Sequence, residues 1–133
     1  MSNCNNLIGV IKLAPYFANY PISSKLFPNG KNKIKSFLYI FKQKDNNIWG
    51  KNYWKFIDEK EYNIENFTGV LDNNVLRLVE DSLSLDSGSS GEFILKKIKT
   101  NQWKVKYLGI GKGITFETLG KFKTNYSNNG HKQ

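Results

Sequence analysis

The sequence predicts an all-β, single-domain fold: an antiparallel β-barrel of about eight strands in a meander, with an irregular N-terminal segment. Three observations predict it. Short runs rich in aromatic and β-branched residues recur roughly every 8–12 residues, which is typical of sandwiches and barrels. The connections between these runs have hairpin length, which favours an up-and-down meander. Residues 103–107 alternate apolar residues with Lys, as a half-buried strand does.

The chain of 133 residues suits one domain. We divide it into an irregular segment at 1–32, the barrel at 33–123 and a flexible tail at 124–133. Within the first segment, residues 7–13 fit a short helix. That segment, which we expect to cap one end of the barrel, holds all three prolines: Pro15, Pro21 and Pro28.

The first predicted hairpin joins residues 33–44 to residues 48–56 through "DNN", because Asn and Asp tolerate the left-handed backbone of tight turns. Gly50 inside the second strand predicts a bulge or a sharp bend. Residues 57–65 fit one or two helical turns and an exposed strand equally well. The later predicted strands are 66–71, 75–80, 82–85, 92–99, 103–110 and 114–122, with a loop at 86–91.

The net charge of +9 is unevenly distributed. Residues 1–56 hold nine Lys and one Asp, and residues 93–133 hold nine Lys and one Glu. Residues 57–92 hold nine acidic residues against Lys60 and Arg77. Acidic central strands that pair with basic neighbours would explain this pattern. A bipolar surface that steers a charged partner is the alternative.

The sequence contains little material for cofactor, metal or nucleophilic chemistry. Its one cysteine, Cys4, and its one histidine, His131, lie near the chain ends, so we expect no metal site, no disulfide and no catalytic triad. "GIGKGIT" at 109–115 lacks the Ser or Thr directly after Lys that a phosphate loop requires, and a β pattern follows it, which predicts a hairpin turn. "DSLSLDSGSSGE" lacks the residue order of an EF-hand loop. We expect no cofactor.

No apolar run is long enough for a signal peptide or a membrane helix, so we expect a cytoplasmic protein without a membrane span.

The candidate ligand-binding residues are the single arginine and a set of strand aromatics. Arg77 lies within "VLRLV". If it faces the interior it is an anchor for a carboxylate or phosphate, and if it faces outward it pairs with an acidic neighbour. Aromatics interleaved with lysines are also able to stack single-stranded bases. The aromatic candidates are Tyr39, Trp54, Trp103, Tyr107 and Phe116.

The stretches "NFTGVLDNNVLRLVEDSLSLDSGSSGEF" and "WKVKYLGIGKGITFETLGKF" resemble the later strands of small antiparallel barrels. Such barrels occur in the calycin group (lipocalins, fatty-acid-binding proteins and avidins) and in allene-oxide-cyclase-like proteins. The resemblance covers about the last 70 residues and implies a barrel that holds a ligand. The G-x-W motif of lipocalins and avidins and the Arg-x-Tyr clamp of fatty-acid-binding proteins are absent, so no functional residue transfers.

We therefore expect non-catalytic binding of a small, partly apolar ligand, with or without an anionic end, inside the barrel. A basic surface that binds nucleic acid or an acidic partner is one alternative. A barrel isomerase or cyclase is the other, and it requires a buried carboxylate that faces the interior, with Glu80 and Glu117 as the first candidates. An interior cavity favours the ligand carrier, and a filled core favours the surface binder.

Overall fold

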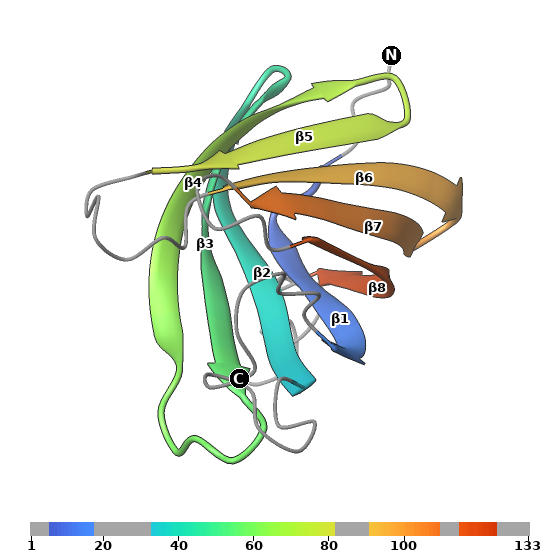
Figure 1. Cartoon of the computed structure of the whole chain (residues 1–133). Helices are drawn as coiled ribbons and strands as arrows, with labels where there is room; N and C mark the ends of the chain where they lie inside the picture. The colour runs from blue at the N-terminus through green and yellow to red at the C-terminus, as the bar shows by residue number, and fades with distance from the viewer. Residues whose placement is uncertain (1–5, 18–32, 82–90, 110–114, 125–133) are drawn as a thin grey trace, which may run out of the picture.

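The protein is a closed barrel of eight antiparallel strands in a meander (Figure 1), as the sequence predicts. The structure, a computed structural model, describes residues 6–17, 33–81, 91–109 and 115–124. Each strand pairs with the next, and β1 closes the barrel by pairing with β8. The strands are β1 (Gly9–Phe17), β2 (Lys33–Lys44), β3 (Asn47–Phe56), β4 (Asn63–Asp72), β5 (Val75–Glu80), β6 (Gly91–Lys99), β7 (Gln102–Gly109) and β8 (Thr115–Thr124).

Three tight turns lie at one end of the barrel, which we call the short-turn end. They join β2 to β3, β4 to β5 and β6 to β7, and each contains a residue with a left-handed backbone: Asp45, Asn73 or Asn101, with φ of 56°, 58° and 63°. Asn and Asp adopt this conformation at low energy, which confirms the "DNN" turn between β2 and β3, and Asn73 and Asn101 lie in the gaps between predicted strands. The longer connections leave the strands at the opposite end, the long-loop end.

Alternation along each strand places one apolar face inside the barrel. The face of Trp103, Val105 and Tyr107 is inward and buried, as predicted. In β2 the inward face is that of Leu38 and Ile40, and the intervening aromatics face outward. The fully buried core side chains are Ile11, Leu13, Leu38, Ile40, Ile48, Phe67, Leu76, Leu78, Phe93, Leu95 and Val105.

The N-terminal segment differs from the expectation, because residues 9–17 form β1 in place of a helix and irregular chain. Ile11 and Leu13 are buried and Lys12 between them is exposed, which is the alternation of a strand. Pro15, which suggested irregular structure, lies at a bulge between Leu13 and Tyr16, just beyond the last residue of β1 that pairs with β8. Its missing N–H therefore removes no bond from that ladder. Pro21 and Pro28 lie outside the described residues.

The ambiguous segment at 57–65 is a connection followed by a strand. Residues 57–62 lead from β3 to β4, which begins at Asn63, and the Ile57 N–H donates to the Lys33 carbonyl. β7 and β8 pair as antiparallel neighbours, as the two strands of a hairpin do, whereas residues 110–114 of "GIGKGIT" lie outside the described residues. The predicted strand at 82–85 and nearly all of the predicted tail lie outside the described residues.

Gly50 lies opposite a bulge, as its position in the sequence predicted. The register of β2 with β3 shifts between Ile40 and Lys42, next to the Ile40–Gly50 pair. A Cβ atom at Gly50 would collide with the Tyr39 carbonyl and with the ring of Phe67. The missing side chain therefore allows Phe67 to fill the barrel interior.

Substitution Gly50→Ala is expected to destabilise the fold by roughly 1–3 kcal/mol, the usual consequence of overpacking. The Phe67 ring is able to shift away from the added Cβ atom. The Tyr39 carbonyl is held in place, because it belongs to the β2–β3 ladder. Urea denaturation measures the change, with Val79→Ala on the exposed outer face as the control. Equal midpoints for Gly50→Ala and the wild type would contradict this account.

Candidate functional site

The barrel interior has an apolar half and a polar half. The half near the short-turn end is lined by aliphatic side chains such as Ile48, Leu76 and Leu95. The half near the long-loop end holds all the buried polar or charged residues of the described chain, which are Ser36, Asn52 and Glu80. Buried tyrosines accompany them. We call this half the polar pocket half, because the pocket described below borders it at Phe116, and treat it as the candidate site.

Glu80 is the centre of the polar pocket half. It ends β5 and is only 5% exposed. Its side chain faces inward, on the same face of the strand as Leu76 and Leu78. The Asn52 side-chain amide donates to Glu80 Oε2 at 2.8 Å, and the Tyr107 hydroxyl donates to Glu80 Oε1 at 2.9 Å. These bonds fix the carboxyl group between β3 and β7.

Burial raises the pKa of Glu80 from its ordinary value near 4.5 to about 7. The hydrogen bonds from Asn52 and Tyr107 and a backbone hydrogen bond from Gly91 act in the opposite direction but do not offset the burial. The charge of Glu65, which lies opposite Asn52 in the β3–β4 ladder, raises the pKa further. Glu80 therefore exchanges a proton near neutral pH, where a general acid or base works best.

Asn52 holds a polar atom without a partner inside the barrel. The residue is 5% exposed, and its Oδ1 accepts no hydrogen bond although its Nδ2 donates to Glu80. Such an atom destabilises the fold by about 1–3 kcal/mol. An unpaired acceptor beside a carboxyl group is therefore a feature that a bound donor would stabilise.

A stack of aromatic rings covers the Glu80 site toward β8 and β1. Phe116 stacks on Tyr107 with centroids 4.9 Å apart and on Tyr16 with centroids 3.8 Å apart. The Tyr16 hydroxyl shares a hydrogen bond of 3.2 Å with Ser36 Oγ. Burial raises the pKa of both tyrosines, and the charge of Glu80 raises that of Tyr107 further. Both phenols therefore stay neutral and act as hydrogen-bonding groups.

Among the described residues, the polar pocket half contains no buried cation. None of the buried residues in the described part of the chain is Lys or Arg, whereas Glu80 is buried and Glu65 is partly buried nearby. A buried carboxylate strongly disfavours a second negative charge at short range. The interior therefore suits a neutral or cationic polar group better than an anionic one.

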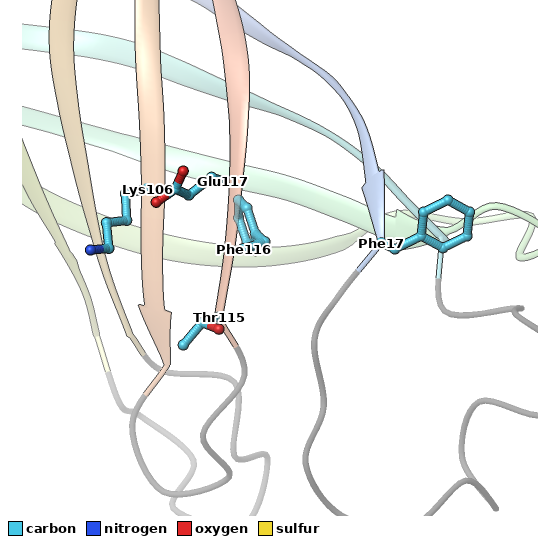
Figure 2. Close-up of a pocket in the computed structure, with 5 residues that line it drawn as sticks. All are labelled: Phe17, Lys106, Thr115, Phe116 and Glu117. Carbon is cyan, nitrogen blue, oxygen red and sulfur yellow. The ribbon is translucent and has the colours of Figure 1, made fainter.

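A seam opens beside this site where β1 leaves β8. The two strands pair only between Gly9–Leu13 and Gly120–Thr124, and beyond that the Thr118 hydroxyl donates to the Ala14 carbonyl at 2.8 Å. Figure 2 shows Phe17, at the end of β1, well apart from β8. A pocket of about 330 Å³ lies there, lined among the described residues by Phe17, Lys106, Thr115, Phe116 and Glu117. Phe116 thus borders both this pocket and the interior stack.

The structure brings two of the six predicted ligand-binding residues together at this site. Tyr107 and Phe116 stack in the polar pocket half. Trp54 also faces inward and packs on the core near the long-loop end, whereas Trp103 is buried near the short-turn end.

The other two predicted ligand-binding residues lie on the outer face. Arg77 is exposed, and its guanidinium lies 3.6 Å from Glu92 on β6. The outward orientation considered for it, with an acidic partner, is therefore the one observed, and it does not reach the interior. Tyr39 is half-buried on the outer face of β2, 6.0 Å from Phe41 between ring centroids.

The sequence pattern predicted Glu80 only as a candidate carboxylate of an enzyme. It did not predict Tyr16, Ser36 and Asn52 as residues of the site. A signal was present, because Glu80 shares the inward parity of the Leu residues of β5. Asn52 likewise shares the parity of Ile48. Glu117, the other candidate acid, lies on the exposed outer face.

Among the described residues no three acidic, His or Cys side chains gather to hold a metal ion. No helix within that part of the chain has the length and apolar character needed to cross a membrane. Comparison of the chain with family models, with curated proteins and with solved structures finds no match.

The raised pKa of Glu80 predicts that stability falls as the pH rises. The unfolded chain loses this proton near pH 4.5 and the folded chain near pH 7, so this group lowers the free energy of unfolding across that window by about 3 kcal/mol. Glu80→Gln should remove the loss, leaving the variant more stable than the wild type at pH 8. Urea denaturation at pH 4.5 and pH 8 measures both effects.

Glu117→Gln, on the outer face, is the matched control and should keep the pH dependence of the wild type. If the difference between the wild type and Glu80→Gln is the same at both pH values, the buried carboxyl does not titrate as described.

Proposed function

We propose that the polar pocket half binds a small amphipathic molecule that is neutral or cationic, with Glu80 as its polar anchor. The observation that carries the proposal is the buried Glu80–Asn52 pair with its unpaired Asn52 Oδ1. A ligand hydroxyl, amide or ammonium group supplies the donor that this acceptor lacks. Such a ligand would offset part of the free energy lost when the Glu80 and Asn52 side chains are removed from water.

The apolar part of the ligand would lie against the aromatic side chains of the same half. Phe116, Tyr107 and Phe93 present stacked and tilted rings there, with Trp54 near the same end of the barrel. Binding sites for small molecules combine such an apolar lining with a few convergent polar groups. The pocket at the seam supports entry past Phe116.

This proposal retains the ligand-holding role that the resemblance to calycin-like barrels implies, but it changes the charge of the ligand. Arg77, the residue expected to anchor an anionic group of the ligand, is directed outward and paired with Glu92. Glu80, when ionised, places a negative charge inside the barrel, and the charge of Glu65 opposes that ionisation. A fatty acid is therefore a poorer fit than an alkylamine or alcohol of the same length.

Two fluorescent probes that differ only in head group test the proposal: a long-chain carboxylic acid and the corresponding alkylamine. We expect the amine to bind at least about tenfold more tightly at pH 8, where an ionised Glu80 attracts it, corresponding to about 1.4 kcal/mol. The preference should weaken at pH 5.5, where Glu80 is protonated. Native mass spectrometry of freshly purified protein should also detect a bound species.

Glu80→Gln should abolish the preference for the amine, and Glu117→Gln should retain it. Tighter binding of the carboxylic acid, or the absence of any bound or displaced species, would contradict the proposal.

A second candidate function follows from the pKa of Glu80 near 7, because that value suits proton transfer at neutral pH. In an isomerase or cyclase of this kind, Glu80 would move a proton of the substrate and Tyr107 would hold the carboxyl in place. Incubation of the captured ligand in D₂O separates the two functions. A proton-transfer enzyme incorporates deuterium into carbon positions, and Glu80→Gln does not. A binding protein leaves the carbon-bound hydrogens unchanged.

A further inference from the structure

The outer face of β2 and β3 carries a cluster of aromatic rings that the barrel core does not use. Phe37 and Tyr53 stack across the two strands with centroids 4.8 Å apart and planes 9° apart. Tyr62 meets both rings edge-on, at 5.5 Å and 6.4 Å. Inward-facing neighbours such as Leu38 and Asn52 fill the interior, so these rings lie on the opposite side of the sheet.

Lysines surround these rings at short range. Lys55 Nζ lies 5.4 Å from the centroid of Tyr62, and Lys42 Nζ lies 4.6 Å from that of Trp49 on the same face. Lys35 is exposed and directly opposite Lys55 in the β2–β3 ladder. We call the surface formed by Lys35, Phe37, Trp49, Tyr53, Lys55 and Tyr62 the aromatic–lysine face.

Barrel closure extends the positive charge beyond this face. The pairing of β1 with β8 joins the two basic segments of the chain, and it places Lys12 directly opposite Lys121. Across β7, β8, β1, β2 and β3 the single acidic residue is Glu117. The acidic residues of the 57–62 connection border the face only at the long-loop end. Like charges placed opposite each other across strands repel, and a bound polyanion would relieve that repulsion.

The combination of rings and lysines selects the kind of polyanion. A surface that binds only phosphate or sulfate needs cations and gains nothing from partly exposed rings. The barrel also has a lysine pair of this simpler kind, because Lys96 on β6 lies directly opposite Lys104 on β7. Stacked aromatic faces set among lysines are the elements that bind single-stranded nucleic acid, because bases stack on the rings and cations follow the phosphates.

We propose that the aromatic–lysine face binds single-stranded nucleic acid with little sequence preference. Bases stack on Phe37, Tyr53 and Trp49, and the phosphates lie along Lys35 and Lys55 toward β1 and β8. This surface is on the outside of the barrel and is independent of the ligand site around Glu80.

Fluorescence anisotropy with a labelled oligothymidylate of about 12 nucleotides, within the range that small β-barrel domains cover, tests the proposal. An oligomer of abasic deoxyribose phosphates of the same length carries the charge without the bases. We expect the oligothymidylate to bind at least about fivefold more tightly than the abasic oligomer, as one stacked base requires. Tyr53→Leu, which keeps an apolar side chain but removes the ring face, should lower the affinity for the oligothymidylate alone.

Lysine variants locate the site on the barrel. Lys35→Gln should reduce the slope of log affinity against log salt by about 0.7, the value for one phosphate contact on a single strand. Lys96→Gln is the matched control, because Lys96 also faces a lysine but lies on β6, on the opposite side of the barrel from β2. That variant should keep the wild-type slope.

Three results would overturn the proposal. The first is equal affinity for the two oligomers, and the second is equal weakening by Lys35→Gln and Lys96→Gln. The third is an unchanged affinity of Tyr53→Leu for the oligothymidylate, provided that its urea midpoint shows it to be folded. Binding to vesicles of anionic phospholipid with no binding to the oligothymidylate would identify a lipid surface as the partner.

Discussion

The pairing of Gly9–Leu13 with Gly120–Thr124 is the constraint on which the rest of this structure depends. It joins the first strand to the last and leaves neither with a free edge along that stretch, so the sheet encloses an interior. Inside, Ile11 and Leu13 contribute to the core. Because the pairing stops after Leu13, the same contact also defines where the seam and its pocket lie.

Closure also determines the electrostatics of the interior. Glu80 ends a strand whose other inward residues are leucines. If the sheet were open at this point, water would solvate the Glu80 carboxyl group. Enclosure by Tyr16, Phe116 and Tyr107 removes water and raises the pKa of its carboxyl group to about 7. The protonation state, the unpaired Asn52 oxygen and the proposed preference for an uncharged or cationic ligand thus all depend on one enclosed space.

The sequence predicted the strands well wherever alternation and turn residues agreed. Trp103, Val105 and Tyr107 faced inward as expected, and Asn73 and Asn101 occupied tight turns. β1 was missed because Pro15 suggested irregular structure, whereas the ladder with β8 ends before that residue. Of the predicted ligand-binding residues, Tyr107 and Phe116 lie in the candidate site, whereas Arg77 pairs with Glu92 outside, since alternation within one strand does not say which of its faces is inward.

The sequence by itself determined the all-β class, the meander order and the positions of the turns, because these depend on local backbone preference and on alternation within one strand. Only the tertiary structure decided which face is buried in strands such as β5, where both faces carry apolar residues, that Asn52, Glu80 and Tyr107 meet, and that the two basic ends of the chain form one surface. These features require contacts between residues far apart in sequence. Such contacts are set by strand register and barrel closure, which local patterns do not specify.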